Sequence, residues 1–179
     1  MEHLTEEEAI ALLRKHATNE EAYAKILAHG RAVAARALEI GHEIAQHHPV
    51  DLTLVKSAAI LHDIGRFSCH DTAAVRHGVA GAEILRSEGL PQHAAIAETH
   101  VGFGITRQDI TEQHLDLPLA DYVPKTLEQK IICYADKLIA GTRRISLKEV
   151  TERFCRELGE QYLKRIAHLH QEIEQLRGS

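Results

Sequence analysis

A short stretch of the sequence places a pair of metal-competent side chains at the end of an apolar run. Residues 58–61 are Ala-Ala-Ile-Leu; His62 and Asp63 come next, and Gly65 follows two residues after the pair. An imidazole beside a carboxylate is costly to bury unless the pair is compensated by another charge or binds a metal ion. We therefore ask which other residues of the chain converge on this pair.

Two further polar residues, His29 and Asp136, fall on the apolar stripes of predicted helices. Taken alone, His29 is more often a hydrogen-bonded core histidine than a ligand. Asp136 is harder to explain in this way, because carboxylates are almost never buried without a partner. One shared metal ion accounts for His29, the His62–Asp63 pair and Asp136 together. Histidine and carboxylate ligands suit Fe, Mn, Co, Ni, Zn or Mg, and spacing does not choose among them.

The hydrophobic periodicity predicts an all-α fold of about seven helices, with the metal site in the core. Capping boxes predict a short helix from Thr5 to about Lys15 and a long one from Thr18 to about Gln46. Asp51 is expected to cap a third helix, which Gly65 ends. The remaining helices are expected over 78–87, from Pro91 to a break at 102–104, from Thr106, from Thr126, and as one final helix over 147–178.

Composition narrows the class of protein. The chain has 21 basic and 26 acidic residues and a formal charge of −5, which argues against a general nucleic-acid or membrane-surface binder. Three cysteines without a CxxC pair, no signal peptide and no membrane-length apolar run predict a cytoplasmic protein. A length of 179 residues predicts a single domain over 1–179, with a core over about 20–145 and a C-terminal helix over about 147–178.

These residues resemble, in type and order, the HD superfamily of metal-dependent phosphohydrolases. His29, His62-Asp63 and Asp136 match the superfamily pattern, and residues 62–65, His-Asp-Ile-Gly, resemble its HDIG branch. Segments 77–85, 98–106 and 121–128 are also similar to those of a group of small uncharacterised HDIG-domain proteins. The resemblance implies a helical HD domain and a hydrolase, without a settled substrate.

The resemblance also implies a set of metal ligands that includes two more histidines, His77 and His100. If this chain resembles the two-metal members, His29, His62, Asp63 and Asp136 would hold the first ion. His77 and His100 would hold the second ion, with Asp63 shared between the two. The alternatives are that His77 and His100 are ordinary helix-terminal residues, or that one ion is bound and either histidine is the general acid. The expected cofactor is a divalent transition metal, two ions of Fe, Mn, Co, Ni or Zn.

The activity implied is hydrolysis of a phosphomonoester or of a nucleotide phosphoester or anhydride, in EC class 3.1, by attack of a metal-bound hydroxide. Asp63, Arg66 and Lys137 are the candidate catalytic residues, and Arg66 and Lys137 the candidate phosphate-binding residues. For both cations, a solvated surface charge is the alternative. Lys125, Arg107, Arg143 and Arg144 are weaker candidates, and Phe103 either stacks on a base or belongs to the core.

Two rival functions share the same ligands. The set also resembles that of HD-type mixed-valent di-iron oxygenases, and a non-catalytic, metal-stabilised nucleotide-binding domain is a third reading. The expected partner is a small phosphate or nucleotide, with no nucleic acid as the main partner and no membrane. Near-heptad spacing from Tyr162 to Leu176 permits a homodimer through the C-terminal helix, with packing inside the chain as the alternative.

Overall fold

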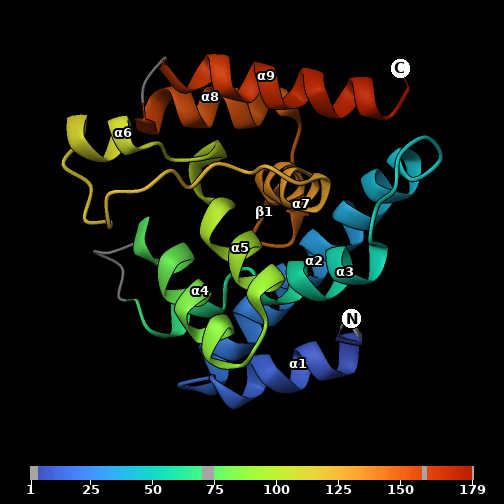
Figure 1. Cartoon of the computed structure of the whole chain (residues 1–179), viewed down its shortest axis with the longest axis vertical. Helices are drawn as coiled ribbons and strands as arrows, with labels where there is room; N and C mark the ends of the chain where they lie inside the picture. The colour runs from blue at the N-terminus through green and yellow to red at the C-terminus, as the bar shows by residue number, and fades with distance from the viewer. Residues whose placement is uncertain (1–3, 70–74, 159–160, 179) are drawn as a thin grey trace.

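The structure is a computed structural model that describes residues 4–69, 75–158 and 161–178, and it is almost entirely helical (Figure 1). This confirms the all-α prediction. In chain order the elements are α1 (Glu6–Lys15), α2 (Glu20–Ile44), α3 (Leu52–Leu61), the 3-10 turn η1 (Ile64–Phe67), α4 (His77–Ser87), α5 (Pro91–Thr99), the 3-10 turn Val101–Phe103, α6 (Arg107–Glu112), α7 (Leu127–Lys137), β1 (Ile139–Ala140), β2 (Arg143–Arg144), α8 (Leu147–Leu158) and α9 (Gln161–Leu176).

The centre of the molecule is formed by α2, α3 and α7, which pack against one another. The apolar stripe of α2 is buried along its length, including Val33, Ala37 and Ile40, and it meets the almost wholly buried α3. Gly30 allows this close approach, because a Cβ at this position would lie 2.9 Å from the carbonyl oxygen of Ile60. The neighbouring residue His29 is thereby held next to the end of α3.

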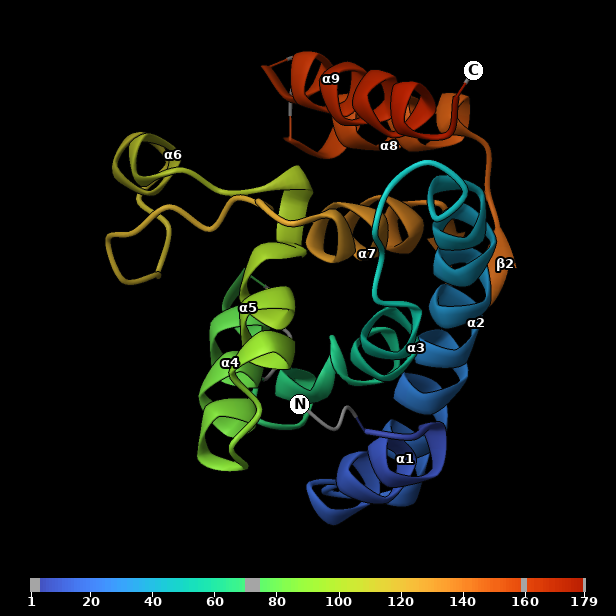
Figure 2. The same ribbon diagram turned by 45° about the vertical axis from the view of Figure 1, so that its right-hand side comes forward.

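Helices α4 and α5 pack on each other beside α3, and η1 lies against α4 (Figure 2). α5 begins with Pro91 at its first turn, as the sequence predicts. α5 ends at Thr99, and the backbone turns at Gly102 and Gly104, both with positive φ. The small helix α6 stands apart from this core, over a satellite cluster that contains Ile105, Ile110 and Tyr122 (Figures 1 and 2).

The prediction of one continuous C-terminal helix is wrong. The segment forms two helices, α8 and α9, which pack against each other on the far side of α7 (Figure 2). Leu158 and Tyr162 keep helical spacing across the junction, so periodicity alone gives no sign of a break. The sequence does carry a glycine at position 159, outside the described residues, and glycine is unfavourable inside a helix.

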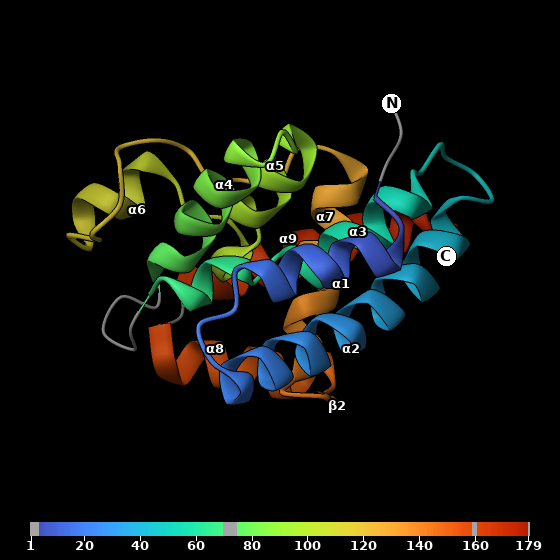
Figure 3. The same ribbon diagram turned by 90° about the horizontal axis from the view of Figure 1, so that it is seen from below.

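The stripe that suggested a dimer seam is used inside the chain. Tyr162, Ile166, Leu169 and Ile173 are all buried, and three of them belong to the main hydrophobic core. Intramolecular packing therefore accounts for the spacing. Seen from below, α1 and α2 cover the side of the molecule away from α4 and α5 (Figure 3).

Smaller differences concern helix ends. Asn19, not Thr18, caps α2, and its side chain accepts a hydrogen bond from the Ala22 amide at 2.8 Å. α3 ends at Leu61 rather than at Gly65, which lies inside η1. The sequence pattern also gave no indication of the antiparallel pair β1–β2, in which Ile139 faces Arg144 and Ala140 faces Arg143. Within the described residues, none of the helices combines the length and apolar character needed to cross a bilayer.

Candidate metal centre

Six side chains from separate parts of the chain meet at the ends of the central helices, and they are the six predicted metal ligands. His29 comes from α2, His62 and Asp63 from the turn after α3, and Asp136 from the last turn of α7. His77 is the first residue of α4, and His100 directly follows α5. Four of the six side chains are buried. Those of His29 and Asp136 are only slightly exposed to solvent.

One group of ligand atoms consists of the Nε2 atoms of His29 and His62 and a carboxylate oxygen of Asp136. Asp136 Oδ1 lies 3.0 Å from His29 Nε2 and 3.6 Å from His62 Nε2. Asp63 Oδ2 lies 3.8 Å from each of the same two nitrogens. Atoms held about 2.1 Å from one ion lie roughly 3.0–3.4 Å apart when their bonds make angles between 90° and the tetrahedral angle. The first group is close to this spacing.

The second group lies on the other side of Asp63. Its Oδ1 atom is 3.2 Å from His77 Nε2 and 3.4 Å from His100 Nε2. The two imidazole nitrogens are 3.0 Å apart. The two oxygens of Asp63 thus face two different groups of nitrogens. Distance alone also permits a grouping of His62 with Asp63 and His100, all within 4.8 Å of one another.

Two atoms of the site are buried without a hydrogen-bond partner among the described residues: His62 Nε2 and Asp63 Oδ1. Such orphaned polar atoms are rare and costly in a folded protein. In two of the imidazole rings, those of His62 and His100, a hydrogen bond to the backbone fixes which nitrogen carries the proton. His62 Nδ1 donates to the Ala59 carbonyl at 2.6 Å, and His100 Nδ1 to the Ala97 carbonyl at 2.7 Å. Each Nε2 is left with its lone pair directed into the site, as metal ligation requires.

The local electrostatics agree with ionised carboxylates and a neutral imidazole. Burial lowers the pKa of His100 to about 3, which keeps the ring neutral. Burial would raise the pKa of Asp63, but the surrounding histidines His62, His100 and His77 hold that pKa well below its usual value. At Asp136 burial is likewise outweighed by Lys137, His29 and His62, and its pKa is also well below normal. A divalent cation would match this donor set of four imidazoles and two carboxylates.

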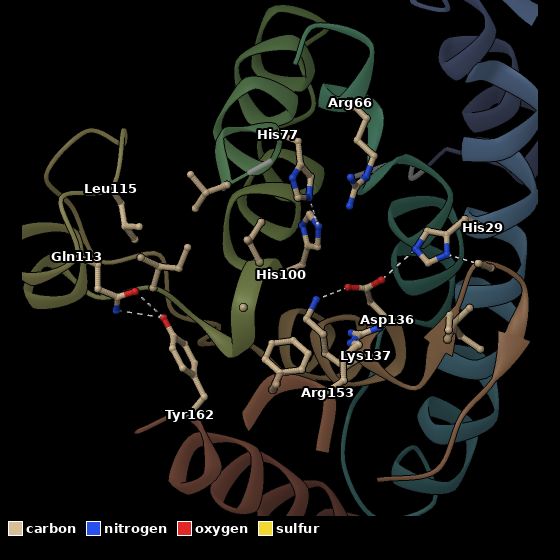
Figure 4. Close-up of a pocket in the computed structure, with 18 residues that line it drawn as sticks. His29, Arg66, His77, His100, Gln113, Leu115, Asp136, Lys137, Arg153 and Tyr162 are labelled. Carbon is tan, nitrogen blue, oxygen red and sulfur yellow. Dashed lines mark hydrogen bonds and ion pairs between the residues drawn. The ribbon is translucent and has the colours of Figure 1, made fainter. Parts of the chain in front are cut away.

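A pocket of about 430 Å³ opens onto the site (Figure 4). Both predicted phosphate-binding cations line it. Arg66 donates from Nε to Asp63 Oδ2 at 2.6 Å, and the buried Lys137 ammonium contacts Asp136 Oδ2. Each cation is therefore positioned by a candidate ligand carboxylate. Lys137 is buried, whereas the Arg66 side chain stays exposed to solvent.

Sequence reasoning missed three polar residues of this pocket: Gln113, Arg153 and Tyr162. The Tyr162 hydroxyl lies 3.2 Å from Gln113 Nε2 and 3.3 Å from Gln113 Oε1, and both side chains form the wall away from the histidines (Figure 4). Arg153 and Tyr162 belong to α8 and α9. Nothing in the sequence placed these helices at the site, because their stripe reads as ordinary core.

The other candidates lie elsewhere. Phe103 packs edge-on against Phe154 with ring centroids 5.0 Å apart, so it belongs to the core. Two histidines near the site in sequence, His70 and His93, could hydrogen-bond its ligands. His93 Nε2 instead lies 2.9 Å from the Ser57 hydroxyl, away from the pocket, and His70 lies outside the described residues. The four weaker cations, Lys125, Arg107, Arg143 and Arg144, do not line the pocket. Two of them pair with glutamates instead: Arg143 with Glu149 and Arg144 with Glu39.

Comparison with known proteins agrees with this fold. The family model of the HD domain matches residues 26–141, a range that contains all six clustered residues from His29 to Asp136. The chain belongs to the HD-domain family. An uncharacterised protein of Methanocaldococcus jannaschii is 40% identical over 174 residues, covering 95% of this chain and 97% of that protein.

Two other relatives are tRNA (cytidine(56)-2'-O)-methyltransferases, from Thermoplasma volcanium, 37% identical, and from Picrophilus torridus, 36% identical. Each alignment covers 78% of this chain but only 40% of the methyltransferase. Among solved structures, the HD domain of the Listeria monocytogenes phosphodiesterase PgpH superposes with a TM-score of 0.58 at 20% identity, covering 95% of this chain and 93% of that one. Its complex with cyclic-di-AMP gives 0.52 at 21%, covering 95% of both chains. At this identity the likeness concerns the fold.

Proposed function

We propose that this protein is a metal-dependent phosphohydrolase that acts on a phosphomonoester or nucleotide of small size. The observation that carries the proposal is the division of the Asp63 carboxylate. Oδ1 faces His77 and His100, whereas Oδ2 faces His29 and His62. A carboxylate placed between two groups of imidazoles can offer one oxygen to each of two ions, as in two-metal hydrolase sites. We assign His29, His62 and Asp136 to one ion, His77 and His100 to the other, and Asp63 to both.

Divalent ions in such a site supply an activated water at neutral pH and polarise the phosphoryl oxygens. The residues of the chain would hold the substrate in place for this chemistry. Arg66 presents its guanidinium at the pocket while its Nε is tied to Asp63, and Lys137 presents its ammonium from α7. Both cations would neutralise charge on the transferring phosphoryl group.

The shape and lining of the pocket limit the substrate. A volume of about 430 Å³ lies in the lower part of the range for small-molecule sites and suits a compound of roughly mononucleotide size. Apolar side chains, including Val101, Ile105 and Leu115, also line the pocket. A nucleotide ligand is also in line with the complex of the PgpH HD domain with cyclic-di-AMP, in which a protein of similar fold binds a nucleotide.

The proposal is tested by assaying the full chain, supplied in turn with Mn, Co, Ni, Fe or Zn, against phosphomonoesters and nucleotides. Hydrolysis that depends on the metal and disappears in Asp63→Ala is expected. The matched control is Asp116→Ala, an exposed aspartate that pairs with Arg76 at the surface. Absence of hydrolysis across the panel, together with O₂ consumption by the iron-loaded protein, would overturn the proposal in favour of an oxygenase.

A further inference from the structure

One wall of the pocket comes from outside the region that the HD family model matches. That match ends at residue 141, whereas α8 begins at Leu147 and α9 ends at Leu176. Arg153 and Phe154 of α8 and Tyr162 of α9 line the pocket together with the candidate metal ligands His29, His77 and Asp136. Figure 4 shows the Arg153 side chain extending from α8 into this space.

Arg153 differs from the other pocket cations in its partners. Arg66 and Lys137 are each bound to a carboxylate of the site. No carboxylate of the described residues pairs with Arg153, and its buried Nε atom has no hydrogen-bond partner there. Its guanidinium carbon lies 5.1 Å from the centre of the Phe154 ring, so the aromatic face holds the side chain in place.

A guanidinium that is half-buried and unpaired is unfavourable unless an anion completes it. Its donors are arranged to bind two oxygens of a phosphate or carboxylate at once. The polar side chains on the wall beyond it are already engaged, because Tyr162 and Gln113 contact each other. Among the pocket residues of α8 and α9, Arg153 is thus the one with unused hydrogen-bonding capacity.

We propose that Arg153 binds the phosphate of the substrate, and that the α8–α9 hairpin is the element by which this chain selects phosphorylated ligands. The proposal rests on the proposed function, since it names a substrate-binding residue of the same pocket. Its test is therefore chosen to read phosphate binding without turnover.

The experiment is calorimetric titration of inorganic phosphate into the Mn-loaded full chain. Arg153→Met keeps the aliphatic stem that covers Phe154 and removes the charge, and Arg153→Lys keeps the charge without the fork. Arg156→Met is the matched control, because Arg156 is exposed on the same helix and does not line the pocket. Melting temperatures of all variants check that the fold is retained.

We expect Arg153→Met to weaken phosphate binding by about 10-fold or more, in proportion to the loss of a charge-assisted hydrogen bond. Arg153→Lys should recover part of the affinity, and Arg156→Met should bind as the wild type does. KM for a phosphoester should rise with the same ranking while kcat changes little. Equal phosphate affinity in wild type and Arg153→Met, or no phosphate binding by the wild type, would overturn the proposal. Phosphate binding without hydrolysis by the wild type would instead count against the proposed function alone.

Discussion

Asp63 Oδ1 lies 3.2 Å from His77 Nε2, although Asp63 follows α3 and His77 opens α4. The approach of the two residues depends on Gly65. A Cβ at that position would lie 2.0 Å from the His77 carbonyl oxygen and 2.4 Å from the Gly81 amide nitrogen. The fourth residue of the His-Asp-Ile-Gly run thus positions the site from outside it, by letting η1 lie directly on α4.

Gly65→Ala is expected to force η1 and α4 apart, because the clash is with backbone atoms that no side-chain rotation can relieve. We expect a loss of stability of about 3 kcal/mol or more, together with weaker binding of the second ion. Urea unfolding and metal titration would measure the two effects. The control is Gly41→Ala, where the added methyl would meet the end of the Leu52 side chain, which can move. A Gly65→Ala protein as stable as Gly41→Ala would contradict this account.

The two groups of nitrogens predict separable losses of metal. His100→Ala removes a candidate ligand that lies on the side of Asp63 Oδ1 and His77, so that variant should keep one tightly bound ion per chain. His29→Ala should likewise lose the ion of the other group. Elemental analysis of protein purified without chelator would give the stoichiometry. Wild-type protein with a single ion that persists in His100→Ala would argue for a one-metal site.

Removal of metal should destabilise the fold. Without an ion, His62 Nε2 and Asp63 Oδ1 remain buried and unsatisfied, and an ion bound only by the folded chain adds its binding free energy to stability. The melting temperature should fall after exhaustive chelation and recover on adding Mn. In Asp63→Ala the two treatments should give nearly the same melting temperature, and a large shift there would place the responsive ion elsewhere.

An ion pair between Asp109 of α6 and Arg165 of α9 should depend on pH. Burial would raise the pKa of Asp109, but Arg165 and Thr106 outweigh it and lower that pKa from 3.8 to about 2. A lowered folded-state pKa means that this stabilisation is fully present above pH 3.8 and is lost as the pH falls through 2. Its size is about 1 kcal/mol, because solvent around the Arg165 guanidinium screens the pair. Asp109→Asn should lower stability at pH 6 by this order and flatten its dependence on pH between 4 and 2, as measured by urea unfolding. An unchanged pH profile would show that the pair contributes nothing.

The sequence was sufficient to predict the helices of the core and to single out the six side chains that the structure brings together. Polar residues on apolar stripes, such as His29 and Asp136, stand out because burial must be compensated, and the HD resemblance places them in order along the chain. Caps with a local mechanism were also predictable. Thr126 and Gln129 form the capping box of α7, for example.

What escaped prediction depends on contacts between distant segments. Periodicity cannot tell one long helix from the two helices α8 and α9, because the apolar spacing continues across the junction. For the same reason Arg153 gave no signal: its position in the pocket follows from how the hairpin folds back on α7 and the 3-10 turn at Val101–Phe103. The backbone approach at Gly65 is likewise visible only when α4 is in place.

The most direct measurement is the metal content and phosphoesterase activity of Asp63→Ala beside wild type and Asp116→Ala. We predict two ions per chain in wild type and Asp116→Ala. We predict that Asp63→Ala, still helical by circular dichroism, binds neither ion and has no detectable activity. A folded Asp63→Ala protein that retains both ions, or retains hydrolysis, would contradict the claim that this carboxylate is shared by the two halves of the site.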